Sequence, residues 1–246
     1  MNAYDSLALG YDRLTYDIPY EKIMRYFMRI FKAYRQKPQR IVDLACGTGS
    51  LSVLLCQQGF DVIGVDLSEQ MLTQAWQKSM DLPKPPVWVH QKMQNLRLPQ
   101  KADAVVCCLD SINYVTKPTD CRKTFCRVFD ALNQKGIFIF DVNTPQKLKG
   151  LNGQIFLDET EDTYCVWRAE FDPKKNICRY GMDIFYRRGD AWERTEEEHL
   201  EYAYSVEELT QYLRDAGFSK IRVFGDRTMK APEEDALRIY FAAQKE

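Results

Sequence analysis

An aspartate and two glycines stand close together in the stretch IVDLACGTGSLSVLL, residues 41–55. Asp43 ends an apolar run, and Gly47 and Gly49 follow in a loop of small residues before a second apolar run. Glycines let a ligand approach the backbone closely, and the N-terminus of a following helix points at such a ligand. A pyrophosphate placed there would face the Asp43 carboxylate, and like charges at close range are unfavourable. The pattern therefore favours a ligand that carries an ammonium group.

A second carboxylate, Asp66, ends the next apolar run, DVIGVD. A carboxylate at the end of a second strand can accept hydrogen bonds from both ribose hydroxyls of a bound nucleoside. Nicotinamide and adenosylmethionine sites share this feature, so Asp66 does not separate them. Asp43 does, because S-adenosylmethionine carries an α-ammonium and a sulfonium but no phosphate. A nicotinamide oxidoreductase is therefore the weaker alternative.

Short apolar runs alternate with helical patterns through the first part of the chain. Continuous rather than alternating apolarity predicts strands buried on both faces, as in a parallel sheet covered by helices. The predicted strands are residues 40–44, 61–66, 87–90, 103–109 and 137–142. The predicted helices are residues 20–35, 50–58, 68–80 and 119–132, the first with one apolar stripe.

The pattern changes after residue 150. Residues 163–172, 177–187 and 192–202 are predicted to be antiparallel strands, and a capping box at Ser205 opens a further helix before two last strands. We predict that residues 1–149 and 203–246 form one domain with an N-terminal helical lid. Residues 150–202 are predicted to be a β-rich insertion over the carboxyl edge of the sheet, as a substrate-side cap or a dimer face.

Four motifs together resemble those of class I S-adenosylmethionine-dependent methyltransferases: VDLACGTG, GVDLS with Met71-Leu72, CCLDSINYV and FIFDVNTP. The chain is most similar to small bacterial orphan methyltransferases and antibiotic-sugar N-methyltransferases, which also carry a Tyr-Asp pair near the N-terminus, here Tyr11-Asp12. The resemblance implies an α/β, Rossmann-like fold. Its seven-stranded sheet would have the order 3-2-1-4-5-7-6, flanked by helices, with a small antiparallel insertion after the fifth strand.

The resemblance also implies a cofactor site for S-adenosylmethionine, with S-adenosylhomocysteine as the product. Two positions depart from the family pattern. Ala45 replaces a glycine, and Lys92 replaces an acidic residue that accepts a hydrogen bond from the adenine amino group. A lysine only donates hydrogen bonds, so it cannot accept this one. The expected cofactor-binding residues are Tyr11, Tyr20, Asp43, Ala45, Gly47, Thr48, Asp66, Leu67, Met71, Lys92, Met93 and Leu109.

Methyl transfer from a sulfonium has a neutral leaving group, so the protein must align the nucleophile, exclude water and sometimes remove a proton. The candidate catalytic residues follow the fourth strand: Asp110, Asn113 and Tyr114. Asp110 has an alternative role as a loop cap or as a support for the cofactor ammonium, and Tyr114 has an alternative role in packing. His90 and His199 are far apart in the sequence, so no metal site is expected.

Composition bounds the partners. The net charge is −1, from 34 basic and 35 acidic residues, and no basic stripe with interleaved aromatic residues is present. No apolar run approaches the length of a membrane span. We therefore expect a cytoplasmic protein, monomer or homodimer, that methylates nitrogen or oxygen of a small molecule and has no nucleic acid or membrane partner. The alternatives are an RNA or protein methyltransferase and a cofactor-binding module that has lost catalysis, which Lys92 suggests.

Overall fold

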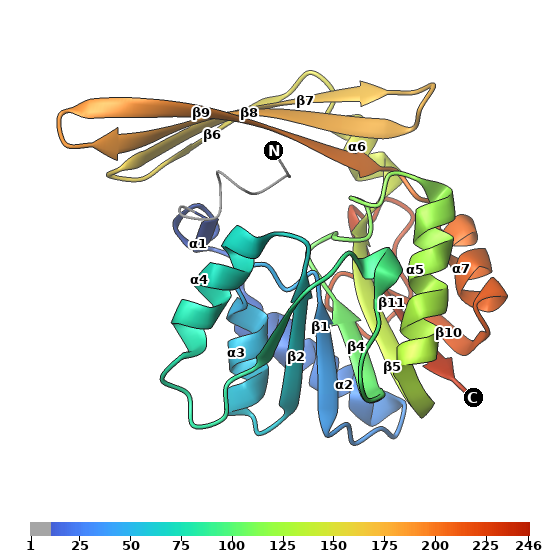
Figure 1. The fold of residues 1–246 in the computed structure, drawn as a ribbon. Coiled ribbons are helices and arrows are strands. Elements are labelled where there is room, and N and C mark those ends of the chain that lie inside the picture. Colours follow the sequence, from blue (N-terminus) through green and yellow to red (C-terminus); the bar gives the residue numbers. More distant parts are fainter. Residues whose placement is uncertain (1–10) are drawn as a thin grey trace.

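The computed structural model of the protein describes residues 11–246. A seven-stranded sheet runs through its centre with the order β3-β2-β1-β4-β5-β11-β10, which confirms the predicted order because β10 and β11 are its sixth and seventh strands along the chain (Figure 1). β11 is antiparallel to both neighbours, and the remaining pairs are parallel. The strands are β1 (Arg40–Leu44), β2 (Asp61–Asp66), β3 (Val87–His90), β4 (Ala102–Cys107), β5 (Leu132–Asn143), β10 (Phe218–Gly225) and β11 (Arg238–Lys245).

Helices cover both faces of this sheet because its strands are apolar on both. On β1, Ile41 packs in one core cluster with the helices α2 and α3, and Val42 packs in another with α5 and α7. The helices are α1 (Tyr11–Leu14), α2 (Tyr20–Ala33), α3 (Ser50–Gln57), α4 (Glu69–Ser79), α5 (Pro118–Ala131), α6 (Pro145–Gly150) and α7 (Val206–Asp215), with a 3-10 turn, η1 (Met93–Asn95). Ser205 and Glu208 form the predicted capping box of α7. Within residues 11–246 no helix is long and apolar enough to cross a membrane.

A second sheet, called the cap below, is antiparallel and has the strand order β6-β7-β8-β9. Its strands are β6 (Ile155–Glu159), β7 (Thr163–Asp172), β8 (Ile177–Arg188) and β9 (Ala191–Tyr202). Figure 1 shows the cap lying across the end of the large sheet where β1, β2 and β4 finish. β6 is a strand that the sequence analysis did not predict. It is an edge strand whose Ile155 and Leu157 are exposed, so it lacks the pattern of a half-buried strand.

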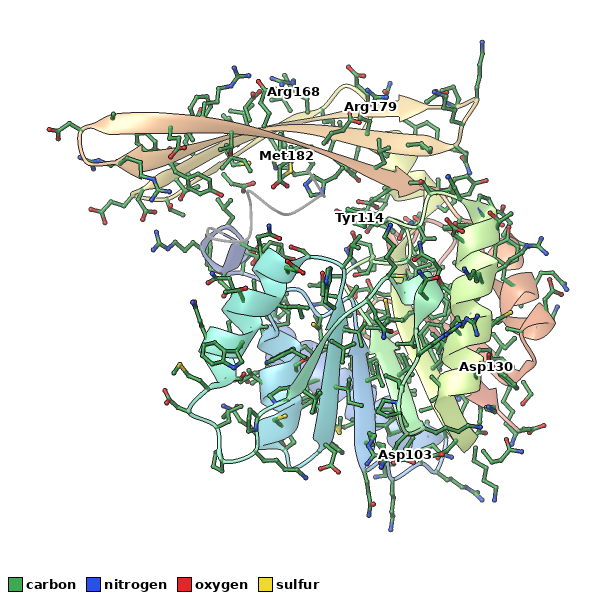
Figure 2. All side chains as sticks on the ribbon, in the orientation of Figure 1. Asp103, Tyr114, Asp130, Arg168, Arg179 and Met182 are labelled. Carbon is green, nitrogen blue, oxygen red and sulfur yellow. The ribbon has the colours of Figure 1, made fainter. Side chains whose placement is uncertain are left out.

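The inner face of the cap, which points toward the large sheet, differs from its outer face. Figure 2 shows Met182 on the inner face and Arg168 and Arg179 on the outer one. Since side chains alternate along a strand, β9 directs Glu197, His199 and Glu201 to the same face as Met182. At one end of the cap, Cys165 and Ile184 pack against Tyr11 and Leu14 of α1. At the other end, Tyr180 packs with Leu148 of α6.

Candidate active site

A cavity of about 380 Å³ opens at the carboxyl ends of β1, β2 and β4. This volume lies in the range of small-molecule and cofactor sites. Every residue predicted to bind the cofactor lines it except Thr48. Those residues are Tyr11, Tyr20, Asp43, Ala45, Gly47, Asp66, Leu67, Met71, Lys92, Met93 and Leu109. Of the candidate catalytic residues, Tyr114 lines the cavity as well.

The loop after β1 follows a tight left-handed path. Ala45, Gly47 and Gly49 all have positive φ, at 59°, 55° and 75°. Ala45 therefore takes a backbone conformation that favours glycine. This agrees with the family pattern, which has a glycine at the position of Ala45. No larger residue fits at Gly49, since an added Cβ would lie 2.5 Å from the ring of Trp88. The loop then leads into α3, whose first residue is Ser50.

Asp43 is a buried carboxylate on the wall of the cavity, only 1% exposed. The hydroxyl of Ser52 donates a hydrogen bond of 2.6 Å to its Oδ2 atom. Burial raises the pKa of Asp43 to about 7, and the hydrogen bond from Ser52 opposes that rise. A cation in the cavity would stabilise the ionised form, so the site is electrostatically suited to an ammonium group.

Asp66 holds the glycine loop to the second strand. Its Oδ2 atom accepts a 2.8 Å hydrogen bond from the Gly47 backbone, and its Oδ1 atom accepts a 2.9 Å bond from the Ser68 backbone. The sequence analysis predicted a ribose contact for Asp66 and did not foresee this anchoring role. A carboxylate oxygen can accept more than one hydrogen bond, so both roles are compatible. Burial raises the pKa of Asp66.

Thr48 follows Gly47 of the cavity wall but does not line the cavity, and its side chain contacts α1 instead. Its hydroxyl donates a 2.6 Å hydrogen bond to Asp12 of α1. Lys78 of α4 reaches the same place, with its Nζ atom 2.7 Å from Asp12 and 3.0 Å from Thr48. The contacts of Thr48 therefore join α1 to the glycine loop. Tyr11 of α1 lines the cavity. The expected lid includes residues 1–10, which lie outside the described residues, so the lid stays a prediction.

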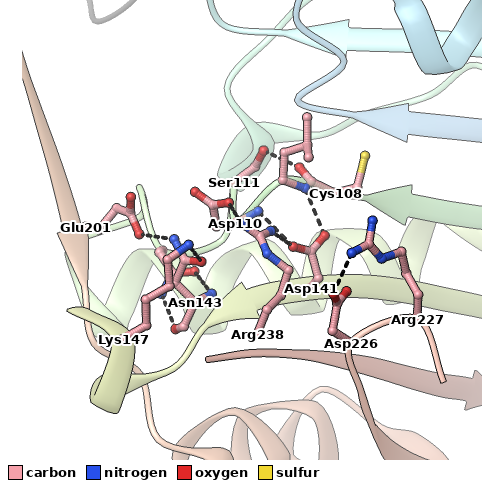
Figure 3. Close-up of polar contacts among 12 residues, drawn as sticks. Cys108, Asp110, Ser111, Asp141, Asn143, Lys147, Glu201, Asp226, Arg227 and Arg238 are labelled. Atoms are coloured by element: carbon pink, nitrogen blue, oxygen red, sulfur yellow. Dashed lines mark hydrogen bonds and ion pairs between the residues drawn. The ribbon is translucent and has the colours of Figure 1, made fainter. Parts of the chain in front are cut away.

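The loop after β4 is held in a strained shape by a buried ion pair. Leu109 and Asp110 have positive φ, at 59° and 54°. Their backbone N–H groups donate hydrogen bonds of 2.8 and 3.1 Å to the carboxylate of Asp141, a wholly buried residue at the end of β5. Arg238 of β11 contacts the carboxylates of both Asp141 and Asp110 (Figure 3). Asp110 is thereby fixed beside Leu109, which lines the cavity.

Asn113 is wholly buried, and its side chain is bonded to backbone groups. The Nδ2 atom donates to the carbonyl oxygens of Asn143 and Tyr202 at 3.1 and 3.0 Å, and Oδ1 accepts from the Asn143 N–H at 3.1 Å. These contacts tie the loop after β4 to β5 and to the last residue of β9. They are contacts of a positioning residue, so a direct catalytic role for Asn113 stays a prediction.

Tyr114 lies between the cavity and the cap. Its ring meets the ring of His199 on β9 edge to face, with centroids 5.9 Å apart. His199 is buried, and its Nε2 atom lies 2.8 Å from the Oε2 atom of Glu197. Figure 2 shows Tyr114 in the space beneath the cap. The cap therefore forms a roof over Tyr114, whereas the residues that line the cavity itself all lie outside the cap.

A cluster of polar side chains lies next to this roof. Among its members, only Asp110 was predicted from the sequence as a site residue. Figure 3 shows the cluster where the ends of β4, β5, β9 and β11 meet α6. Asn143 is central: it donates a 2.9 Å hydrogen bond from Nδ2 to Glu201, and its Oδ1 atom accepts one of 2.8 Å from Lys147. We use the name polar cluster for Asp110, Asp141, Asn143, Lys147, Glu201 and Arg238.

Burial changes the proton affinities in this cluster. The pKa of Glu201 is raised to about 8, first by burial and then by the charge of Asp110. The pKa of Lys147 is lowered, mainly by burial. The one signal for Glu201 in the sequence is its spacing of two from His199 and Glu197, which places all three on one face of a strand. That signal becomes informative only when the position of β9 is known.

Comparisons with known proteins agree with this geometry. The sequence model of a family described as "Methyltransferase domain" matches residues 41–136. The chain is 34% identical over 244 residues to a Bacillus subtilis (strain 168) protein provisionally named methyltransferase YqeM, covering 98% of the chain and 97% of that protein. It is 26% identical over 224 residues to a glycine/sarcosine N-methyltransferase of Halorhodospira halochloris, covering 84% and 75%. The crystal structure of an S-adenosylmethionine-dependent methyltransferase from Clostridium acetobutylicum ATCC 824 superposes with a TM-score of 0.88 at 30% identity, covering 99% of both chains.

Proposed function

The chain belongs to the class I S-adenosylmethionine-dependent methyltransferases, and from this premise we propose that it methylates a nitrogen or oxygen atom of a small molecule bound beneath the cap. The observation that carries the proposal is the place of the cavity, at the carboxyl ends of β1, β2 and β4. The cap lies across this same end of the large sheet (Figure 1). The relative from Halorhodospira halochloris, named for glycine and sarcosine, supports a small acceptor.

The residues that line the cavity fit the cofactor chemically. We propose that Asp43 pairs with the ammonium group, that Asp66 accepts the ribose hydroxyls, and that Leu67 and Met93 pack on the adenine. Small residues at left-handed positions let the backbone approach the ligand closely. When bound, the cofactor would supply a methyl group that is bonded to its sulfonium sulfur and is activated by the positive charge on that sulfur.

The protein then has to hold the acceptor in line and exclude water. We propose that Asp110 and Tyr114 contact the acceptor, since one is fixed beside the cavity and the other lies in its wall. Asn113 is proposed as a positioning residue, because its bonds join the loop after β4 to β5 and the cap. The cap then excludes water over the acceptor, as its contacts with Tyr114 suggest.

Calorimetric titration with S-adenosylmethionine, S-adenosylhomocysteine and NADH tests the cofactor site. We expect saturable binding of the two adenosyl ligands and none of NADH. Mass spectrometry of small-molecule, RNA and protein acceptors then tests the acceptor class. Methylation of RNA or protein with no small-molecule product would overturn the proposal. A cytoplasmic location, a monomeric or homodimeric state and the division at residues 150–202 stay predictions.

A further inference from the structure

We propose that the acceptor is a primary or secondary amine that arrives as an ammonium ion, and that the carboxylate of Glu201 on the cap takes its proton. The inference rests on the proposed function, methyl transfer to a small molecule. It starts from a hydrogen-bonded chain in the polar cluster that the cofactor site does not use. Glu201, Asn143 and Lys147 form this chain, through bonds of 2.9 and 2.8 Å.

The chain has the geometry of a fixed proton acceptor. Glu201 is 3% exposed, and its Oε2 atom is held by the Asn143 amide. Asn143 is itself held, because its backbone N–H donates to Asn113 and its Oδ1 atom accepts from Lys147. A carboxylate fixed in this way from β5 of the large sheet loses little freedom when it accepts a proton from a bound substrate.

Asp110 connects this chain to the cofactor cavity. Asp110 lies between Leu109 and Ser111, which both line the cavity. Glu201 lies two residues along β9 from His199, on the same face, and the His199 ring meets the ring of Tyr114 in the cavity wall. The charge of Asp110 also raises the pKa of Glu201. Figure 3 shows Asp110 and Glu201 on either side of Asn143 and Lys147. A small acceptor between the cap and the methyl donor would reach both carboxylates.

The charges favour a cationic acceptor over a neutral or anionic one. Arg238 is already shared by Asp110 and Asp141, so it offers little to a substrate anion. Lys147 is held by Asn143, and burial lowers its pKa. With these groups ionised, two cations face the three carboxylates of Asp110, Asp141 and Glu201. An ammonium ion would balance the remaining negative charge.

Proton affinities separate an amine from an alcohol. The groups that face Glu201 are Asp110 on the loop after β4, Lys147 on α6, and Tyr180 and Cys178 on β8. Burial and the charge of Asp110 raise the pKa of Glu201 to about 8, although the hydrogen bonds from Asn143 and Tyr180 and the charge of Lys147 oppose that rise. An alkylammonium ion has a pKa of about 10, so transfer to Glu201 is nearly balanced. An alcohol is a far weaker acid, and a carboxylate cannot ionise it to a useful extent.

The proposed reaction begins with proton transfer from the acceptor to Glu201. An N–H bond of the ammonium ion breaks, and the proton binds the Glu201 carboxylate. The lone pair left on nitrogen forms the new N–C bond with the methyl carbon, and the C–S bond breaks with its electron pair left on sulfur. The methylated product carries the positive charge that the sulfonium lost. Loss of the Glu201 proton to solvent then restores the site.

Infrared titration tests the proton on Glu201 without any acceptor. The wild-type protein and Glu201→Gln are compared, with Glu198→Gln as a matched control on the outer face of the same strand, where Glu198 pairs with Arg179. We expect a protonated-carboxyl band that titrates near pH 8 in the wild type and in the control and is missing from Glu201→Gln. A Glu201 that is fully ionised at pH 6 would overturn the inference.

Turnover with matched acceptor pairs tests the substrate class. The probes are glycine with glycolate, ethanolamine with ethylene glycol, and glucosamine with glucose, and methylated products are detected by mass spectrometry. We expect products from amines only. Glu201→Gln should lower kcat at pH 7.5 by about 100-fold or more and remove the fall in kcat below pH 8. Glu198→Gln should leave both unchanged.

Tyr180→Phe provides a second variant that does not alter the carboxyl group. The Tyr180 hydroxyl bonds to Glu201 and lowers its pKa, so its loss should move the fall in kcat to higher pH. Failure of the wild-type protein to bind S-adenosylhomocysteine would refute the proposed function itself. Cofactor binding with methylated hydroxyl compounds, with no amine product, or with a Glu201→Gln rate equal to the wild type would overturn this inference alone.

Discussion

The cofactor cavity and the polar cluster both contain carboxylates with raised pKa values, yet they hold them differently. In the cavity, uncharged donors hold Asp43 and Asp66: a serine hydroxyl and two backbone N–H groups. In the polar cluster, Arg238 clamps Asp110 and Asp141. The first arrangement pairs the carboxylates with uncharged donors, which leaves their charge for a cationic ligand. In the second, Arg238 neutralises two carboxylates, and Asp141 holds the loop after β4.

The two regions also differ in their origin along the chain. The cavity is formed mostly by residues 43–93, in which each strand leads directly into the loop that lines it. The polar cluster gathers residues from the loop after β4, β5, α6, β9 and β11, and Asp110 and Arg238 are 128 positions apart in the sequence. We conclude that the cavity depends on local turns and the cluster on tertiary packing. Substitutions in the cavity should therefore mainly change ligand affinity, whereas loss of Arg238 from the polar cluster should mainly change the free energy of unfolding.

The largest expected effect is on the polar cluster. Arg238→Met keeps the bulk of the side chain but leaves the carboxylates of Asp141 and Asp110 without their cation. Asp141 is wholly buried, so the free energy of unfolding should fall by about 3–5 kcal/mol. Urea denaturation measures this. Arg238→Lys should lose less than Arg238→Met, because it keeps a cation beside the carboxylates. It should still lose some stability, because an ammonium group cannot pair with two carboxylates as the guanidinium does.

A loss for Arg238→Met no greater than that of a surface ion pair would contradict this view. It would mean that the two carboxylates take up protons and that the arginine does not hold the loop. The contrast with the cavity would then disappear, because both regions would tolerate a carboxyl group without a cation.

Asp66→Ala tests the cavity by ligand binding. Affinity for S-adenosylmethionine should fall by about 1.5–3 kcal/mol, since a charged hydrogen-bond acceptor is lost. Calorimetry gives the value. Asp61→Ala, at the start of the same strand β2, is the control, because Asp61 pairs with Lys84 away from the cavity. Unchanged affinity in a folded Asp66→Ala protein would refute the ribose contact.

The pH dependence of stability and of ligand binding provides a third test, through Asp43, whose pKa is raised to about 7. The folded protein holds this proton above the pH at which an unfolded aspartate loses it. Asp43 therefore lowers stability progressively as pH rises from about 4 to 7. Binding of an ammonium-bearing ligand needs the ionised form, so affinity should rise about tenfold between pH 6 and pH 8. Asp43→Asn should remove that rise, and an equal rise in the variant would exclude Asp43 as its cause.

The sequence predicted the large sheet because strands buried on both faces leave continuous apolar runs. It also predicted the cavity, since Asp43, Asp66 and the glycines between them are neighbours in the chain. β6 was missed because its Ile155 and Leu157 side chains are exposed at an edge. Buried and exposed residues alternate there only weakly, so no periodic pattern marks the strand.

The polar cluster could not be predicted in the same way. Arg238 and Lys147 look like surface residues until β11 and α6 are placed beside the loop after β4. The glutamate run in β9 shows the same limit, because the side chain of Glu197 is 4% exposed and those of Glu196 and Glu198 are 68% and 54% exposed. Strand alternation decides which of them is buried, and composition alone cannot.

The smallest expected effect concerns Lys92, the position where the cavity departs from its family. Lys92 lines the cavity and immediately precedes the η1 turn, and its carbonyl accepts a 2.8 Å hydrogen bond from Asn95. An aspartate is well tolerated before such a turn, so Lys92→Asp should fold. It should tighten S-adenosylmethionine binding by about 0.5–1.5 kcal/mol through a new acceptor for the adenine amino group. Lys92→Met, which removes the charge and adds no acceptor, should change little in calorimetry. Weaker binding by Lys92→Asp alone would mean that the cavity has adapted to the lysine, and the adenine edge would then be held by backbone groups.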